Sequence, residues 1–230
     1  MEICFIRDVI MDYIVSDIEG TLTTGSSWKA IRSYYKANFS AWRYNRFFLN
    51  WVPRYLMVAL GFYSRKQAIS KWMEEEAALF RDIPRQDFKR MADWVVEVVM
   101  WPKRRKNVLK EIKRVRQDGA QVLVVSSGYQ PIVEAFAERM DAIPIGTPLK
   151  FKSDRIEGIS YPVNAYEHKA ARIRKETKSG TILVAYGDTI SDLSMLELSQ
   201  SPVVVSPDQK LRKIAEGRGW RIIEEQEGEL

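Results

Sequence analysis

The stretch SDIEGTLT, residues 16–23, places two acidic side chains, Asp17 and Glu19, directly after the apolar run 13–15 and just before Gly20. Ionised carboxylates beside a buried strand cost free energy unless a cation or hydrogen-bond donors compensate them. An aspartate in this position could attack an electrophile or bind a metal ion, and Gly20 would let the backbone approach a ligand closely. An ordinary surface turn explains this stretch alone equally well.

Three further stretches carry polar groups that could join the same site. Ser126 follows the apolar run 120–125, Asp188 and Asp192 follow the run 181–186, and Lys169 lies in EHKAARI. Each has a simpler explanation by itself, as a turn, a helix cap or a solvated lysine. The carboxyl ends of parallel strands meet at one edge of a sheet, so we expect these groups to lie close together.

Clustered carboxylates need a cation, and carboxylate and carbonyl oxygens suit Mg²⁺, which completes its shell with water and phosphate oxygens. A phosphate ester is therefore the natural substrate. Asp17 could attack phosphorus and form an aspartyl-phosphate, while Lys169 and the groups around Ser126 bind the phosphate oxygens. Glu19 would protonate the leaving alkoxide and later deprotonate the attacking water.

Strands and helices must alternate if these residues are to meet, and the sequence after Trp101 predicts this alternation. Such a pattern is typical of an α/β fold with a doubly wound parallel sheet covered on both faces. A hairpin is predicted at 149–160, turning at Ser153 and Asp154. The predicted strands are 12–17, 120–127, 142–145, 181–188, 202–206 and 220–223, and the predicted helices are 103–119, 131–140, 165–177, 190–198 and 208–217.

Residues 25–101 form an aromatic-rich insertion with no convincing strand, and helices are predicted at 65–80 and 84–100. The apolar stretch 47–63 is interrupted by polar residues and is shorter than the roughly 20 residues that span a bilayer. Within it, Pro53 suits the first turn of a compact helix and Gly61 its end. We predict a core domain of residues 1–24 and 102–230 and a smaller all-helical cap of residues 25–101.

The segments DIEGTLT, VVSSGY, the lysine of EHKAARI and YGDTISDLSML resemble, in this order, motifs one to four of the haloacid dehalogenase (HAD) superfamily. The insertion after motif one is similar to that of the phosphoserine-phosphatase-like branch, subfamily IB, whose Rossmann-like core carries a helical cap. The resemblance implies that Asp17 is the nucleophile, Glu19 the acid and base, and Lys169 a catalytic phosphate ligand.

The same resemblance implies the remaining ligands. Magnesium is expected at Asp17, the Glu19 carbonyl and Asp188, with Asp192 supporting Lys169 and metal-bound water. The residues expected around the phosphate are Gly20, Thr21, Ser126, Ser127, Gly128 and Lys169.

Three positions depart from the family pattern. Glu19 replaces the usual second aspartate of motif one with a longer acid. Phosphoserine phosphatases typically carry a glutamate nine residues after the nucleophile, where this chain has Ser26. Ser191 stands where an asparagine is common. The loss of the glutamate that would bind an ammonium group disfavours free phosphoserine as the substrate.

Composition restricts the class of protein. The chain has 230 residues, 46% of them hydrophobic, and a formal charge of +6, which fits a folded domain with an anionic ligand. Its one cysteine, Cys4, excludes an internal disulfide framework, and we predict a cytoplasmic location.

Residues 1–10 do not resemble a signal peptide and are interpreted as an extension or an upstream start. The basic run 103–106 resembles a solvated helix face more than a nucleic-acid site.

The sequence therefore predicts a magnesium-dependent phosphomonoester hydrolase that acts on a small phosphorylated metabolite. A first alternative is a phosphatase for lysophospholipids or other amphiphilic phosphates with peripheral membrane contact, suggested by the aromatic, basic residues 39–63. A second is a catalytically weak, phosphate-binding regulatory protein, suggested by Glu19. A phosphotransferase that passes the group from Asp17 to another alcohol is a third. The oligomeric state is not indicated.

Overall fold

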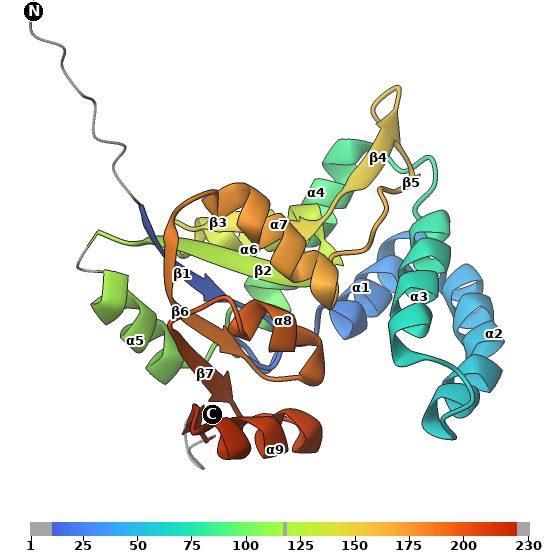
Figure 1. Ribbon diagram of the computed structural model, residues 1–230. Coiled ribbons are helices and arrows are strands. Elements are labelled where there is room, and N and C mark those ends of the chain that lie inside the picture. The colour runs from blue at the N-terminus through green and yellow to red at the C-terminus, as the bar shows by residue number, and fades with distance from the viewer. Residues whose placement is uncertain (1–10, 117–118, 225–230) are drawn as a thin grey trace, which may run out of the picture.

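The computed structural model describes residues 11–116 and 119–224, so Cys4 and the predicted extension 1–10 lie outside the described residues. Its centre is a six-stranded, all-parallel sheet in the order β3-β2-β1-β6-β7-β8 (Figure 1). The predicted α/β fold is confirmed. The strands are β1 (Asp12–Ser16), β2 (Gln121–Tyr129), β3 (Ile143–Thr147), β6 (Thr181–Gly187), β7 (Ser201–Val205) and β8 (Arg221–Ile223).

Neighbouring residues of the central strands point to opposite faces of the sheet, and both faces are buried. Ile14 and Val124 belong to one apolar cluster, whereas Val15 and Leu123 belong to another. This arrangement explains why the strands are apolar throughout rather than alternating. Helices α5 (Lys106–Val115) and α6 (Gln130–Glu138) contribute to the first cluster, and α7 (Glu167–Thr177), α8 (Leu193–Leu196) and α9 (Gln209–Arg218) contribute to the second.

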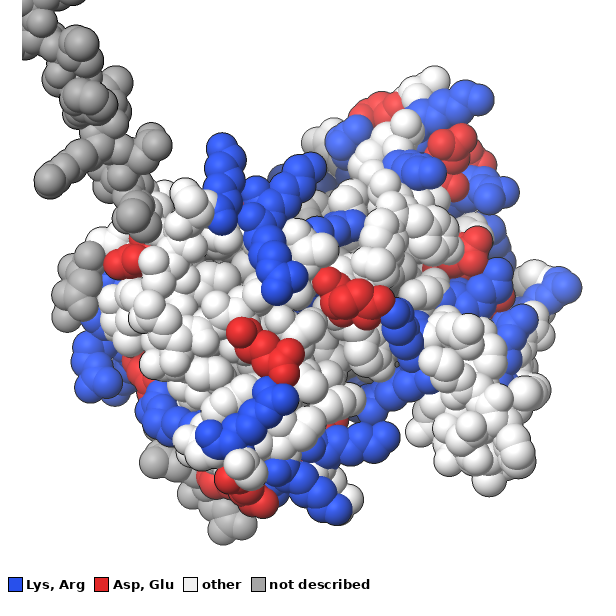
Figure 2. All heavy atoms as spheres, in the orientation of Figure 1, with Lys and Arg blue, Asp and Glu red and all other residues white. Residues whose placement is uncertain are grey.

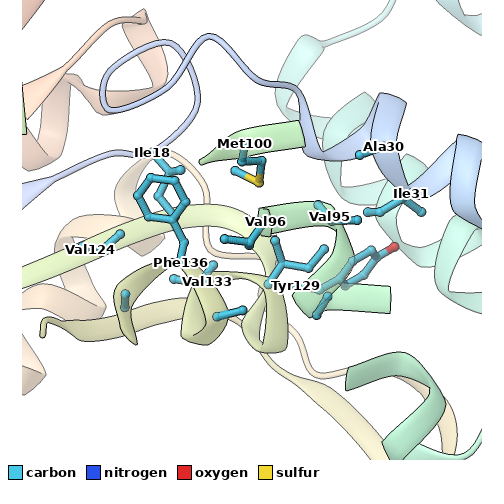
Figure 3. Close-up of a cluster of buried hydrophobic side chains, with 14 of the residues drawn as sticks. Ile18, Ala30, Ile31, Val95, Val96, Met100, Val124, Tyr129, Val133 and Phe136 are labelled. Carbon is cyan, nitrogen blue, oxygen red and sulfur yellow. The ribbon is translucent and has the colours of Figure 1, made fainter. Parts of the chain in front are cut away.

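The region between β1 and α5 is helical, as predicted. It contains α1 (Ser27–Tyr35), a π-helical turn (Lys36–Ser40), α2 (Ala41–Ala59), α3 (Arg65–Leu79), and α4 (Arg85–Trp94), which continues as a π-helix (Val95–Met100). The buried aromatic side chains of this region are Tyr35, Tyr44, Phe47, Trp51, Phe80 and Phe88. Figure 3 shows that Val96 and Met100 meet Ile18 and Phe136, so the helical region and one face of the sheet share a continuous core.

The structure corrects the predicted position of Pro53. This residue does not begin a helix but lies inside α2, which runs without a break from Ala41. Proline removes the hydrogen bond to the carbonyl four residues earlier, at Leu49. Both residues are exposed, so water can bind that carbonyl and the helix tolerates the proline.

The predicted hairpin is present, with strands β4 (Leu149–Lys152) and β5 (Arg155–Ile159). Its turn has positive φ angles at Ser153 (47°) and Asp154 (61°), which match a tight two-residue turn. The hairpin contacts the loop between α3 and α4. There the amide of Ile156 donates to the carbonyl of Ile83 at 3.0 Å, and the amide of Asp82 donates to that of Ile156 at 2.9 Å.

Candidate active site

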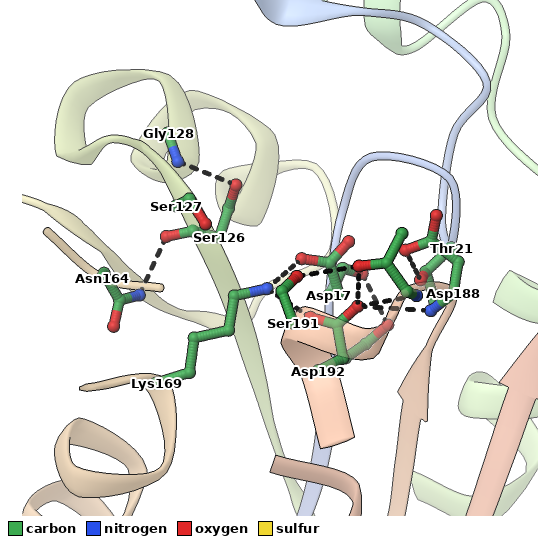
Figure 4. Close-up of polar contacts among 12 residues, drawn as sticks. Asp17, Thr21, Ser126, Ser127, Gly128, Asn164, Lys169, Asp188, Ser191 and Asp192 are labelled. Carbon is green, nitrogen blue, oxygen red and sulfur yellow. Dashed lines mark hydrogen bonds and ion pairs between the residues drawn. The ribbon is translucent and has the colours of Figure 1, made fainter. Parts of the chain in front are cut away.

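Lys169 lies between two aspartates at the carboxyl edge of the sheet (Figure 4). Its Nζ is 2.5 Å from Oδ1 of Asp17 and 2.6 Å from Oδ1 of Asp192. Asp17 follows β1, Asp192 ends a single 3₁₀ turn after β6, and Lys169 lies in the first turn of α7. All three side chains are buried. Three segments far apart in the chain thus bring two acids and one ammonium together.

Asp188 completes the acidic cluster from the end of β6. Carboxylate oxygens of Asp17, Asp188 and Asp192 lie within 4.8 Å of one another. The Thr21 hydroxyl donates to Oδ1 of Asp188 at 3.4 Å, so Thr21 contacts a carboxylate of the cluster. Gly20 leaves the space for this side chain, because a Cβ there would be 1.9 Å from Oδ2 of Asp188. Its φ of 89° also favours glycine.

The charges of this cluster are unbalanced. Burial, together with repulsion from Asp17 and Asp192, raises the pKa of Asp188 to about 9. Burial also raises the pKa of Asp17 to about 7, although Lys169 opposes the shift. Burial disfavours the Lys169 ammonium, but attraction to Asp17 and Asp192 outweighs it and raises the pKa of that lysine. Three carboxylates share one lysine, so a further cation would stabilise their ionised forms.

This donor set fits Mg²⁺. The ion takes oxygen ligands and is commonly bound by one or two carboxylates together with water and phosphate oxygens. Asp17, Asp188 and Asp192 each offer such an oxygen; Asp17 and Asp192 are buried and Asp188 is half-buried. The three aspartates expected around Mg²⁺ therefore lie together. Glu19, whose carbonyl is the fourth expected group, follows Asp17 by two positions in the same loop.

The Glu19 side chain points toward the start of α1. The amide of Ser27 donates to its Oε2 at 3.1 Å, and the Ser27 hydroxyl donates to Oε1. Burial raises the pKa of Glu19, while the hydrogen bonds from Ser27 oppose the shift. A raised pKa favours the protonated form, which is the form that a proton donor needs. Glu19 has a longer side chain than the aspartate that is usual in motif one. Through Ser27, this side chain connects motif one to the first residue of α1.

Ser126, Ser127 and Gly128 lie at the end of β2, the strand next to β1. The register pairs Ser16 with Val124, so these residues extend past the same sheet edge as Asp17. The amide of Gly128 donates to the Ser126 hydroxyl at 3.1 Å. The Ser127 carbonyl accepts from the Thr147 hydroxyl at 2.8 Å. The loop is thus held in a turn.

Asn164 supports this turn and was missed by sequence analysis. Its buried amide nitrogen donates to the carbonyls of Ser126 (2.8 Å) and Ile145 (2.9 Å), and its backbone amide donates to the Thr147 hydroxyl (3.0 Å). Asn164 fixes β2, β3 and the segment before α7 relative to each other. No local motif marks it, because its partners are 17 or more residues away.

Asp208 supports the loop that carries Asp188 and was also missed. It caps α9 by accepting from the amide of Leu211 at 2.8 Å, and its other oxygen accepts from the amide of Ile190 at 3.2 Å. The segment SPDQ, residues 206–209, does indicate the cap, since aspartate is a common N-cap residue before a helix. Its second bond, to the loop after β6, carries no such signal.

The basic run 103–106 also contributes to the site region. Arg105 precedes α5, and its Nε donates to the carbonyl of Gly20 at 3.1 Å. The backbone amide of Arg105 donates to the carbonyl of Leu22 at 2.8 Å. The run was predicted to resemble a solvated helix face, but one of its members holds the loop that follows Asp17.

Comparison with known proteins agrees with this geometry. A family model described as haloacid dehalogenase-like hydrolase matches residues 14–197. A protein of Mycobacterium tuberculosis named as a probable phosphatase is 34% identical over 110 residues, which are 46% of this chain and 38% of that relative. The chain thus matches less than half of the relative's length.

Two solved structures show a similar fold. A protein of unknown function from Bordetella pertussis Tohama I has a TM-score of 0.76 and 18% identity, with 94% of this chain and 99% of that one covered. A substrate-bound phosphoserine phosphatase has a TM-score of 0.61 and 17% identity, with 94% and 93% covered. The family match and these folds confirm the resemblance found in the four motifs: the chain belongs to the haloacid dehalogenase-like hydrolases and has a phosphoserine-phosphatase-like fold.

Proposed function

We propose that this protein is a Mg²⁺-dependent phosphomonoester hydrolase that works through a phosphorylated Asp17. The observation that carries the proposal is the position of Asp17, buried at a strand end, in contact with Lys169 and within a cluster that includes Asp188. A cluster of this kind provides a nucleophile and a positive group for the phosphate oxygens. The probable phosphatase of M. tuberculosis is consistent with this class of reaction.

In the first step, a carboxylate oxygen of Asp17 forms a bond to phosphorus while the bond between phosphorus and the leaving oxygen breaks. The Glu19 carboxyl gives its proton to the leaving alkoxide. Lys169 contacts Asp17 and is placed to neutralise phosphate oxygens during the transfer. The turn at Ser126 lies at the neighbouring strand end, and its amides and hydroxyl would donate to the same phosphate.

In the second step, water attacks the phosphorus of the aspartyl-phosphate and the bond to the Asp17 oxygen breaks. Glu19, now ionised, accepts the proton of the water. Inorganic phosphate leaves, and both side chains return to their starting states. Mg²⁺ held by Asp17, Asp188 and the Glu19 carbonyl, with Asp192 supporting Lys169, would reduce the repulsion between the Asp17 carboxylate and the phosphate.

The proposal is tested by phosphate release from a generic aryl phosphate, with and without Mg²⁺. Wild-type protein should release phosphate only with the metal, and Asp17→Asn should lose this activity. Asp141→Asn is the matched control, because Asp141 is exposed and its ion pair in the described structure is with Arg116 at the surface. If wild-type protein binds phosphate but releases none, the alternative of a phosphate-binding regulatory protein replaces the enzyme.

Amphiphilic phosphates are the second candidate substrate class, and one observation favours them. Residues 39–62 expose large apolar side chains such as Leu49 and Leu56, and the same segment carries Arg43 and Arg46, so an amphiphilic phosphate would find both apolar and basic groups there. A panel of amino-acid, sugar, nucleotide and lipid phosphates separates the classes. A preference for lysophospholipid phosphates over short-chain esters would support this candidate, whereas equal rates would exclude it.

A further inference from the structure

The outer side of α2 exposes large apolar side chains that the catalytic proposal does not use. Of the twelve large apolar side chains that are exposed in the described structure, nine fall between residues 39 and 62. We call this group the α2 surface. Its members are Phe39, Trp42, Leu49, Val52, Tyr55, Leu56, Met57, Leu60 and Phe62. Exposed apolar groups are ordinary when scattered, but nine of them concentrated on one helix and its two ends mark an interaction site.

Helix geometry shows that the row containing Trp42 is separate from the side that packs in the core, whereas Tyr55 lies eleven residues after Tyr44 and so shares the side of that buried residue. Trp42, Leu49 and Leu56 are seven residues apart and so lie along one face of the helix. Tyr44 and Trp51 lie on the opposite side and are buried. Intramolecular packing therefore accounts for one apolar face of α2 and leaves the other unexplained.

The segment that carries this surface is strongly basic. Between Gly20 and Met73 the chain has nine lysine and arginine residues and no aspartate or glutamate. Arg54 pairs with Glu75 outside this segment. Among the described residues Arg43 and Arg46 form no ion pair, and Arg46 stacks on Trp42 with its guanidinium 5.5 Å from the ring. Figure 2 shows the lobe of α2 and α3 as largely white, with blue at its margin.

The charges decide which partner fits. A two-fold contact of the α2 surface with itself would place Arg43 and Arg46 of one copy against the basic flank of the other, with no acid in the segment to offset them. Acidic phospholipids offer both an apolar interior and negative headgroups. Trp42, in the same row as Leu49 and Leu56, suits the boundary between these two layers, where aromatic rings with a polar edge are favoured.

We infer that the α2 surface docks this protein onto a bilayer that contains acidic phospholipids. The apolar side chains enter the outer part of the acyl layer, and Arg43 and Arg46 contact the headgroups. This is contact with one leaflet, since no helix among the described residues is long and apolar enough to cross a membrane. The inference does not depend on the proposed chemistry.

Co-sedimentation with vesicles tests this inference. The full chain is mixed with vesicles of phosphatidylcholine alone or of phosphatidylcholine with phosphatidylserine. We expect binding to the mixed vesicles that weakens as salt is raised. Leu49→Gln/Leu56→Gln should reduce binding at least tenfold, and Arg43→Gln/Arg46→Gln should remove the preference for phosphatidylserine. Val98→Gln is the matched control, because Val98 is 53% exposed but lies outside the α2 surface.

Three results would overturn the inference. The first is the absence of binding to phosphatidylserine vesicles at low salt, and the second is unchanged binding by the leucine variant. The third is a wild-type dimer that becomes monomeric in the leucine variant in sedimentation velocity, because a second copy would then cover the surface. Thermal unfolding of each variant checks that it is folded.

Discussion

The Nζ of Lys169 lies 2.5 Å from Oδ1 of Asp17, although 152 positions separate the two residues in the chain. The contact forms because β1 lies beside β6 and α7 leads into β6, so the first turn of α7 faces the end of β1. Both side chains are buried, which strengthens their attraction and makes the loss of either one costly.

Replacement of this lysine is therefore expected to affect both stability and activity. Lys169→Met leaves Asp17 and Asp192 buried without their ammonium partner. Without divalent ions, the free energy of unfolding in urea should fall by about 3–5 kcal/mol. Phosphate release should fall at least about a hundredfold. Lys175→Met, on the exposed side of the same helix, is the control and should change neither. Near-normal turnover by Lys169→Met would contradict the role given to this residue.

Gly20 should be intolerant of a methyl group. In Gly20→Ala the new Cβ would overlap with Asp188 and the residue would keep a positive φ. We expect the free energy of unfolding to fall by about 1–3 kcal/mol and the Mg²⁺ concentration needed for half-maximal activity to rise. Gly217→Ala, in α9 with open space around it, should instead increase stability by up to about 1 kcal/mol. If Gly20→Ala needed the same Mg²⁺ concentration as wild-type protein, the close approach of Asp188 to Gly20 would be unimportant for metal binding.

A second buried acid, Glu76, should give the protein a measurable pH dependence. The hydroxyl of Tyr44 donates to its Oε1 at 2.6 Å and that of Tyr129 to its Oε2 at 3.1 Å. Burial raises the pKa of Glu76 to about 7, against the hydrogen bonds from these tyrosines.

The sign of the effect follows from proton binding. The folded state holds the Glu76 proton more tightly than the unfolded chain, whose pKa is near 4.5. A rise in pH from about 4.5 to 7 should therefore lower the stability of wild-type protein relative to Glu76→Gln, by up to about 3 kcal/mol. Urea unfolding of both proteins across this range measures the difference. Parallel stability profiles would mean that Glu76 titrates normally.

Glu19→Gln should affect substrates according to their leaving group. An alkoxide needs a proton to leave, whereas a nitrophenolate needs little help. The rate of the first step should thus fall much more for an alkyl phosphate than for p-nitrophenyl phosphate, as measured by rapid mixing. Ser33→Ala, an exposed position of α1, provides the comparison variant. Equal losses in the first step for both substrates would argue against proton donation by Glu19.

Sequence patterns predicted the parts of this protein that follow from alternation and strand order. Asp17, Ser126 and Asp188 each follow an apolar run, and parallel strands bring such ends to one edge. Lys169 could be placed there because its helix leads into the next strand. The turn of the hairpin was also predictable, since Ser153 and Asp154 tolerate the positive φ that it requires.

Long-range support was not predictable from a single sequence. Asn164 holds the turn at Ser126 through bonds to carbonyls that any residue could supply. The contact between Ile156 and Ile83 depends on how the hairpin meets the α3–α4 loop. The position of Pro53 could not be predicted from the preference of proline for the first turn of a helix. Because Pro53 is exposed, α2 tolerates it within the helix.

Covalent attack by Asp17 is the central step of the proposed mechanism, and trapping the phosphorylated enzyme tests it directly. Glu19→Gln lacks the base for the second step, so a phosphorylated enzyme should accumulate. The variant is mixed with labelled aryl phosphate and Mg²⁺, quenched in acid, and digested for mass spectrometry. We predict one phosphoryl group on Asp17 that hydroxylamine removes and that Asp17→Asn/Glu19→Gln never acquires. A phosphoryl group on another residue, or one that survives loss of the Asp17 carboxylate, would contradict the mechanism.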